Sequence, residues 1–143
     1  MDMIEANLSP FIALLGGACF AIVYKIPRRY FIHATLLAMT AKLTVDFLSA
    51  KTHISFATFF AAFLVGAVSH VFARSSGKPA QAFLIPGVMY LVPGTSLYRA
   101  IASAMTNDFT ATSSALAQAV IVTASISFAL LLANWIVPSK RAL

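Results

Sequence analysis

The sequence predicts an all-α, polytopic helical membrane protein, and three observations lead to this fold class. Of the 143 residues, 60% are hydrophobic and only 10% are charged, whereas soluble domains carry about 25% charged residues. The mean hydropathy is +0.88, which is too apolar for a disordered chain. Short polar or charged turns separate apolar runs, and the length accommodates about five helices of roughly 20 residues. The composition therefore argues against a soluble enzyme or a nucleic-acid-binding domain, despite the net charge of +6.

We expect residues 1–143 to form a single transmembrane domain. The expected spans are approximately 8–24, 31–50, 54–73, 80–105 and 110–137. The first run is expected to remain in the mature protein, because Asp2 and Glu5 stand where a signal peptide needs basic residues. The single cysteine, Cys19, excludes an internal disulfide.

The basic residues predict the orientation of these spans, since cytoplasmic loops carry an excess of lysine and arginine. With the N-terminus outside and the C-terminus inside, the outer side receives only Lys51, and Lys42 and Arg99 lie within spans. The inner side then receives seven basic residues, which are Lys25, Arg28, Arg29, Arg74, Lys78, Lys140 and Arg141. The basic charge is therefore interpreted as a topology signal that faces anionic lipid headgroups, with no nucleic acid as partner.

Small residues at four-residue spacing predict faces for close helix packing, because lipid removes most of the hydrophobic drive between helices. The stripes are Ala111, Ala115, Ala119, Thr123 and Ser127 in the fifth run, Ala13, Gly17 and Ala21 in the first, and Ala62, Gly66 and His70 in the third. They favour packing within the bundle. The alternative is that one stripe docks a separate subunit or a second copy of the chain.

The fourth run, 80–105, contains two Pro-Gly steps, Pro86-Gly87 and Pro93-Gly94. Proline removes a backbone donor and clashes with the preceding turn, and the following glycine permits unusual backbone conformations. As a straight helix the run would be about 39 Å long, against a hydrocarbon core of about 30 Å. We therefore expect the fourth helix to be broken at these steps. Broken backbone at membrane depth is tolerated only where protein covers it or water reaches it.

A substrate pathway along this broken segment is one interpretation, and a kinked packing helix without a ligand is the other. Thr95 or Ser96 could cap a new helix whose free amides suit a carboxylate. Arg99 could be the counter-charge for that carboxylate, or it could reach the outer headgroups by snorkelling. The candidate pathway residues are Pro86, Gly87, Pro93, Gly94, Thr95, Ser96, Tyr98 and Arg99.

Lys42 and Asp46 are charged residues inside the second run, and their four-residue spacing places them on one helix face. They are interpreted either as an ion pair that is hidden in the bundle or as a proton-coupling pair. In the second case Asp46 takes up a proton and the pair breaks during transport. The three histidines lie on different spans or loops, and no catalytic motif is present. We therefore expect no metal, no cofactor and no enzymatic activity.

Three blocks of the sequence carry a family resemblance: residues 16–27 (GGACFAIVYKIP), 58–66 (TFFAAFLVG) and 83–94 (FLIPGVMYLVPG), the last followed by Tyr98. Over nearly its full length the chain resembles the threonine/serine exporter (ThrE) family, and within it the small-subunit, YjjB-like proteins. The resemblance implies a multi-pass protein of the bacterial inner membrane that exports threonine, serine or related small carboxylates such as succinate. It also implies a larger, separately encoded YjjP-like partner subunit.

Two other functions stay open at this point. The chain could be an assembly or scaffold subunit that stabilises a larger carrier, or it could be a homo-oligomeric channel. The resemblance does not assign roles to Lys42, Asp46 and Arg99, which are inferred from the physical cost of charge within a membrane.

Overall fold

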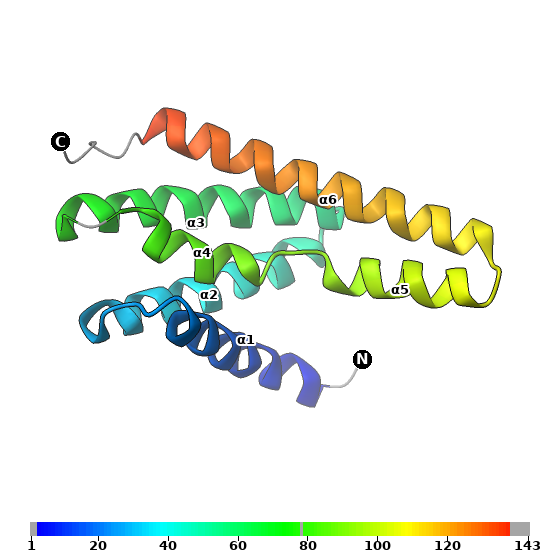
Figure 1. Ribbon diagram of the computed structural model, residues 1–143, viewed down its shortest axis with the longest axis horizontal. Coiled ribbons are helices and arrows are strands. Elements are labelled where there is room, and N and C mark those ends of the chain that lie inside the picture. Colours follow the sequence, from blue (N-terminus) through cyan, green and yellow to red (C-terminus); the bar gives the residue numbers. More distant parts are fainter. Residues whose placement is uncertain (1–2, 78, 138–143) are drawn as a thin grey trace.

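The computed structural model describes residues 3–77 and 79–137, and all regular structure in these residues is α-helical. Figure 1 shows the helices lying roughly along the long axis of the molecule. Their bounds are α1 (Met3–Val23), α2 (Arg28–Ser49), α3 (Ile54–Ser76), α4 (Gln81–Met89), α5 (Gly94–Met105) and α6 (Phe109–Ile136).

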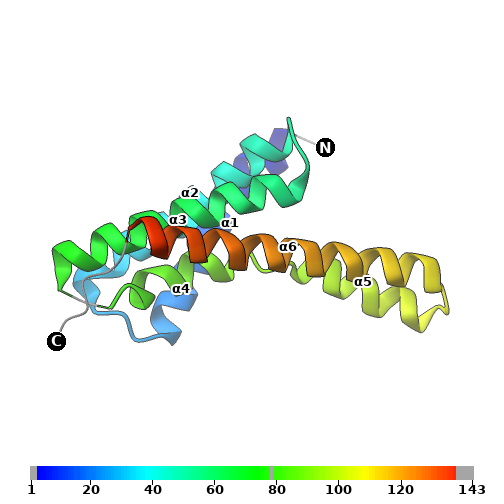
Figure 2. The same ribbon diagram turned by 90° about the horizontal axis from the view of Figure 1, so that it is seen from above.

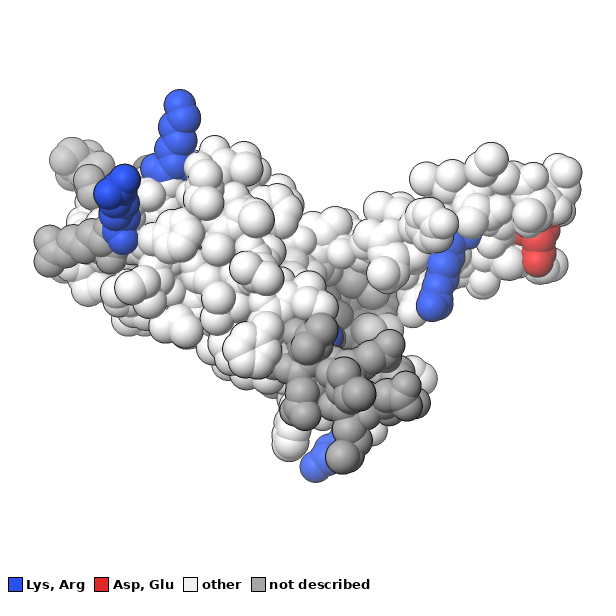
Figure 3. Space-filling view, turned by 90° about the horizontal axis from the view of Figure 1, so that it is seen from below, with Lys and Arg blue, Asp and Glu red and all other residues white. Residues whose placement is uncertain are grey.

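The chain runs back and forth between the two ends of the molecule (Figure 1). Helices α1, α3 and α6 run in one direction, and α2 and the α4–α5 pair run in the other. The α1–α2 and α3–α4 connections therefore lie at the same end as the C-terminal end of α6. The space-filling view shows basic side chains at that end and an acidic side chain at the opposite tip (Figure 3).

Among the residues that the structure describes, three helical stretches are long and apolar enough to cross a membrane by length and composition: Tyr30–Ser49, Ile54–Ser76 and Phe109–Ile136. The expected first span corresponds to α1, where the residues with described side chains include the shorter apolar stretch Leu14–Val23. The expected fourth span corresponds to α4 and α5, which are 9 and 12 residues long. The helices thus point to a membrane protein, while the count of five spans and the orientation remain predictions.

The first Pro-Gly step does not break the fourth run, so that part of the prediction was wrong. Helix α4 continues through Pro86 and Gly87, and both residues are buried. Proline removes only the hydrogen bond to the carbonyl of Ala82 in this short helix. A Cβ atom on Gly87 would come within 2.7 Å of Cγ1 of Val65 in α3. The step therefore allows close packing of α4 on α3, which offsets the lost bond.

The second Pro-Gly step does separate two helices. Pro93 has φ −76° and ψ 57°, and the Gly94 amide donates a hydrogen bond of 2.7 Å to the carbonyl of Val92. This is an inverse γ-turn. Helix α5 begins at Gly94, and its N-cap is Pro93 without a side-chain hydrogen bond. Thr95 and Ser96 are therefore the second and third helical residues, and the prediction that one of them caps the helix was wrong.

The core lies between α2, α3, α4 and α6. Its buried members are Leu37, Ala41, Ala61, Ala62, Val65, Phe83, Leu91, Val122, Ile126 and Ala129. Small residues allow the closest approaches, because a Cβ atom on Gly66 would come within 2.7 Å of the Cβ atom of Ala133. Ala62, Gly66 and His70 of the predicted stripe on α3 are all buried.

The predicted stripe on α6 was wrong in its second half. The buried positions are Ala115, Ala119, Val122, Ile126, Ala129 and Ala133, whereas Thr123 and Ser127 are exposed. An α-helix has 3.6 residues per turn, so strict four-residue steps drift away from the contact face. Steps that alternate between three and four residues stay on it. In the first stripe Gly17 and Ala21 are buried, and the side chain of Ala13 lies outside the described ones.

Helix α5 contacts only α6 among the described helices. Figure 2 shows α5 and the N-terminal half of α6 extending beyond the other helices, and we call this hairpin the α5–α6 arm (residues 94–120). Several of its large apolar side chains are exposed, including Tyr98, Ile101, Met105 and Val120. The bundle and the arm meet at the break between α4 and α5.

Candidate functional site

A cavity of about 320 Å³ lies at the break between α4 and α5. The non-helical linker, residues 90–93, forms one wall, and α2, α3, α5 and α6 contribute the others. The lining residues are Lys42, Val45, Ile54, Thr58, Tyr90, Leu91, Val92, Pro93, Thr95, Ser96, Arg99, Gln118 and Val122. The interrupted backbone thus lines a cavity, which is the setting in which a membrane protein tolerates it.

The cavity brings together two groups of residues that sequence reasoning treated separately. Pro93, Thr95, Ser96 and Arg99 come from the linker and the first turns of α5, and Lys42 comes from α2. These residues line one cavity because the linker passes beside α2, an arrangement that the spacing along the chain does not reveal. The structure therefore places both predicted cationic groups at one cavity.

The remaining predicted residues are not among those that line the cavity. Pro86 and Gly87 are buried in the core contact between α4 and α3. Gly94 is exposed at the start of α5, and no atom would lie within 4 Å of a Cβ atom built on it. Tyr98 is 74% exposed on the α5–α6 arm. Asp46 is not a lining residue, and its ion-pair partner is one.

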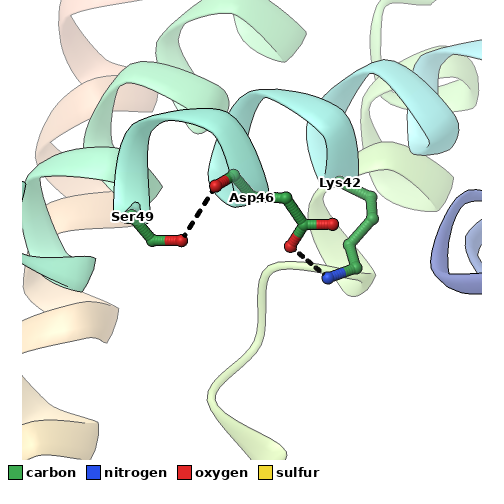
Figure 4. Close-up of polar contacts among 3 residues, drawn as sticks. All are labelled: Lys42, Asp46 and Ser49. Carbon is green, nitrogen blue, oxygen red and sulfur yellow. Dashed lines mark hydrogen bonds and ion pairs between the residues drawn. The ribbon is translucent and has the colours of Figure 1, made fainter. Parts of the chain in front are cut away.

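That partner is Lys42, whose ammonium nitrogen pairs with Oδ1 of Asp46. Figure 4 shows the two side chains side by side on α2, with the hydroxyl of Ser49 donating to the backbone carbonyl of Asp46. The Lys42 side chain is 21% exposed and that of Asp46 is 40% exposed. Lys42 lines the cavity and Asp46 does not. The ion pair therefore lies at the edge of the cavity, with Lys42 on the side that faces the cavity.

The electrostatics of the cavity favour an anion. Arg99, which is exposed, supplies positive charge, and Lys42 supplies a further cation that is paired with Asp46. The first turn of α5 adds the positive end of a helix dipole and amides without a partner inside the helix. No Asp or Glu is found among the described residues that line the cavity. A small carboxylate would meet donors from both α2 and α5.

Comparison with known families then identifies the chain. The family model "Threonine/Serine exporter, ThrE" matches residues 9–136. The chain belongs to the threonine/serine exporter family. Neither the comparison with curated proteins nor that with solved structures gives a match. Family membership confirms the resemblance to the threonine/serine exporter family, while the assignment to its small-subunit, YjjB-like proteins stays a prediction. It places the cavity in a protein of a transporter family.

Sequence reasoning missed three polar residues of this exporter-family cavity: Gln118, Thr58 and Tyr90. Gln118 could have been predicted from the sequence, because burying a side-chain amide within an apolar run is costly in a membrane and therefore indicates a functional or packing role. Thr58 bonds back to the carbonyl of Ile54 at 2.7 Å, a local pattern that does not distinguish it from other threonines. Tyr90 lies in the block 83–94 that carries the family resemblance, but nothing in the sequence distinguishes it as a cavity residue.

None of the three histidines is among the residues that line the cavity, although His53 directly precedes the lining residue Ile54. His33 contacts the ring of Phe72 at 5.2 Å, and His70 is buried in α3. Within residues 3–77 and 79–137, no group of three or more His, Cys, Asp or Glu residues is placed to hold a metal ion.

Proposed function

We propose that this chain is a subunit of a membrane exporter for threonine, serine or related small carboxylates, and that the cavity at the α4–α5 break is its substrate site. One observation carries the proposal: Lys42 from α2 and Arg99 from α5 line the same cavity as the interrupted backbone. Discontinuous helices build the substrate sites of many transporters, with helix N-termini directed at anionic groups. Thr95 and Ser96, in the first turn of α5, line the cavity, which supports this proposal.

The chemistry of the lining suits a carboxylate on a small solute. The guanidinium of Arg99 offers two parallel donors to a carboxylate, and the hydroxyls of Thr95 and Ser96 offer further ones. The volume of about 320 Å³ lies at the lower end of the range for small-molecule sites. Gln118 and Thr58 then supply neutral groups for the rest of the solute.

Alternating access would use the α4–α5 break as a hinge. Helix α4 packs on α1, α2 and α3, whereas α5 packs only on α6 among the described helices. The γ-turn at Pro93 joins them, and hinges are a few element-terminal residues that absorb the change in backbone angles. Movement of the α5–α6 arm would carry Arg99 relative to Lys42 and so change access to the cavity.

The complete exporter is proposed to need a larger YjjP-like subunit in the bacterial inner membrane, with this chain oriented N-terminus outside and C-terminus inside. Even the five spans predicted from the sequence are few for a complete alternating-access machine. The α5–α6 arm exposes large apolar side chains along its length, and contiguous apolar surface suits either lipid or another membrane subunit. Proton coupling is proposed to use Asp46, the acidic member of the ion pair.

The alternative is an assembly or scaffold role, and the same arm favours it. Helix α5, which contacts only α6 among the described helices, would suit docking to a carrier that holds the substrate itself. Under this alternative the cavity is a packing defect at the junction, and changes in its lining would lower the amount of the larger subunit rather than its turnover.

The deciding experiment measures efflux of labelled serine, threonine and succinate from cells that produce this chain alone, the YjjP-like subunit alone, or both. We expect efflux only with both. The variants Arg99→Gln and Gln118→Ala are then expected to lower efflux while both subunits stay at wild-type abundance. Loss of the larger subunit in these variants would instead favour the scaffold role. Efflux by this chain alone, without uphill transport, would indicate a channel.

A further inference from the structure

We propose that the elbow between α1 and α2 holds one anionic phospholipid, with its phosphodiester between Lys25 and Arg28 and an acyl chain against the apolar residues beside them. This site is separate from the cavity at the α4–α5 break and requires no transport activity of the chain. It lies at the end of the molecule where the α1–α2 and α3–α4 connections are found (Figure 1).

Another cavity, of about 500 Å³, lies at this elbow, and we call it the elbow cavity. Its lining combines two basic and four apolar residues, which are Lys25, Arg28, Ile22, Ile26, Phe31 and Ile32. The end of α1, the connection and the first two turns of α2 all contribute to it. Among the described residues, it shares no lining residue with the cavity at the α4–α5 break.

The connection between α1 and α2 is a tight turn that fixes the position of Lys25. The Ile26 amide donates a hydrogen bond of 3.0 Å to the Ala21 carbonyl. The Lys25 amide donates one of 2.9 Å to the Ile22 carbonyl. These two bonds form a Schellman motif, in which the residue after the helix adopts a left-handed conformation. Lys25 has this conformation, with φ 51°, and Ile26 anchors the turn because it is buried with Ala21 and Ala34.

Lysine is an unusual residue at such a position. A left-handed conformation suits glycine, which has no Cβ atom, and asparagine, but it costs free energy for most other residues. The other described residues with positive φ follow this rule, with Gly77 after α3 and Asn107 after α5. The turn by itself would therefore favour glycine at position 25, and the lysine is better explained by what its side chain binds.

The charges at the elbow cavity favour an anion. Lys25 and Arg28 are both exposed, and Arg28 is the first residue of α2. The residue before it gives α2 no side-chain cap, so the first turn also presents the positive end of a helix dipole. The acidic side chains that the structure describes belong to Asp46, which pairs with another lysine, and to Asp108, which caps α6. A phosphodiester with one negative charge would meet two cations at the elbow.

The apolar lining distinguishes a lipid from a soluble phosphate. Ile22 and Ile32 are both 66% exposed, and Ile32 follows Arg28 by four residues, which places the two on one face of α2. A soluble phosphate ester would contact only the cations. A phospholipid contacts both parts of the lining, because its phosphodiester is charged and its acyl chains are apolar. Basic pockets between transmembrane helices are known binding sites for anionic headgroups.

The elbow also lies at the depth where phosphate groups are expected. It joins two apolar stretches, Leu14–Val23 in α1 and Tyr30–Ser49 in α2, and the two isoleucines lie inside them. Lys25 and Arg28 stand just outside these stretches. Basic side chains are seen at this end of the molecule (Figure 3). The cations are thus placed for the headgroup of a lipid and the isoleucines for its chain.

Native mass spectrometry of the purified full chain in a neutral detergent measures the binding of the first lipid. The probes are phosphatidylglycerol, which is anionic, and phosphatidylcholine with the same acyl chains, which has no net charge. Inorganic phosphate and sn-glycerol 3-phosphate supply the phosphate group without a chain. We expect the wild type to bind one phosphatidylglycerol about tenfold more tightly than phosphatidylcholine, and to bind neither soluble phosphate at the same concentration.

Lys25→Gly is the most informative variant, because lipid binding and stability are expected to change in opposite directions. Glycine suits the left-handed turn, so the lipid-free variant is expected to unfold in detergent at the wild-type temperature or above it. Loss of the ammonium group is expected to weaken phosphatidylglycerol binding about fivefold, the factor for one basic residue near an anionic surface. Arg28→Gln is expected to weaken it by a similar factor, and the double variant by about tenfold to thirtyfold.

Two controls are matched to these changes. Arg74→Gln/Lys78→Gln also removes two positive charges, at and after the end of α3, and Arg74 does not line the elbow cavity. This variant is expected to leave the binding of the first phosphatidylglycerol nearly unchanged. Ile32→Ser is expected to weaken that binding severalfold through lost apolar contact. Ile12→Ser, at an exposed isoleucine in the first half of α1, is its control and is expected to bind as the wild type does.

Equal binding of phosphatidylglycerol and phosphatidylcholine, or equal losses in the elbow variant and the charge-matched control, would overturn the elbow as a site for an anionic lipid. Binding of sn-glycerol 3-phosphate as tight as that of phosphatidylglycerol would overturn the lipid as its ligand. Undiminished binding by Lys25→Gly, which is expected to fold even if Arg28→Gln does not, would also overturn the proposal. None of these measurements depends on efflux, so the exporter function and the lipid site can fail separately.

Discussion

Gly17 of α1 lies so close to Ala38 of α2 that a Cβ atom on Gly17 would come within 2.6 Å of the Ala38 Cβ atom. Its neighbour Gly16 has no atom within 4 Å of the corresponding position. We expect Gly17→Ala to destabilise the fold by about 1–3 kcal/mol through overpacking. Gly16→Ala is expected to be neutral or stabilising by up to about 1 kcal/mol, because alanine favours a helix over glycine. Thermal unfolding in detergent checks both, and equal effects at the two positions would contradict the α1–α2 contact.

Pro93 and Gly94 interrupt the fourth run, so replacing both with alanine should allow α4 and α5 to join into one continuous helix. We expect this double variant to lose export in the cell assay while its abundance stays at the wild-type level, because the linker wall of the cavity is lost. Pro86→Ala is the matched comparison, since Pro86 lies inside α4 and its replacement leaves the break in place. Normal export by the double variant would contradict the broken-helix mechanism.

Arg99 lies on the second turn of α5 and lines the cavity. We expect Arg99→Gln to raise the half-saturating concentration for export by about tenfold to a hundredfold, since hydrogen bonds to charged groups contribute about 1.5–3 kcal/mol. The half-saturating concentration of Arg99→Lys is expected to lie between those of the wild type and Arg99→Gln, because lysine keeps the charge and loses the paired donors. Arg74→Gln, at the C-terminal end of α3, is the matched control. Half-saturation that Arg99→Gln leaves unchanged would remove Arg99 from the site.

Asp108 caps α6, where its carboxylate accepts a hydrogen bond of 3.0 Å from the Ala111 amide and one of 2.7 Å from the Thr110 hydroxyl. The Ala111 amide first, and the Thr110 hydroxyl second, hold the pKa of this carboxyl group below its ordinary value of 3.8. The contribution of Asp108 to stability is therefore present above that ordinary pKa and is lost as the pH falls through the lower, folded-state pKa.

We accordingly expect the protection of the Ala111 amide, which is its exchange rate compared with the intrinsic rate at the same pH, to fall at strongly acidic pH. Asp108→Asn keeps an acceptor oxygen and is expected to remove this pH dependence, whereas Asp108→Ala is expected to show fast exchange at every pH. Hydrogen-exchange mass spectrometry of the peptide that contains the start of α6 measures the effect. Exchange in Asp108→Asn that still depends on pH as in the wild type would assign the effect to another group.

Local chemistry made several features predictable from the sequence. The all-helical class follows from the apolar content, and the break at Pro93 follows from the geometry of proline. The Lys42–Asp46 pair follows from the four-residue spacing on one helix. The break and the ion pair each depend on residues within about one turn of each other, so the local sequence is enough to predict them. The fold class depends only on composition.

Long-range packing explains what the sequence did not predict. Pro86 stays inside a helix because Gly87 lets α4 approach Val65 of α3, and the sequence does not show which helix lies opposite. Thr123 leaves the contact face of α6 because the buried positions follow the partners of that helix, first α5 and then α3.

The sequence by itself determined which residues carry charge within the apolar runs and where the fourth run must be interrupted. Only the tertiary structure decided that the linker crosses beside α2, so that Lys42 and Arg99, which are 57 positions apart in the chain, line one cavity with Gln118 from α6. The physical reason is that the rotation and crossing of helices depend on small-residue contacts such as Gly66 with Ala133. Those contacts join distant segments, and their partners are set by the folded bundle as a whole.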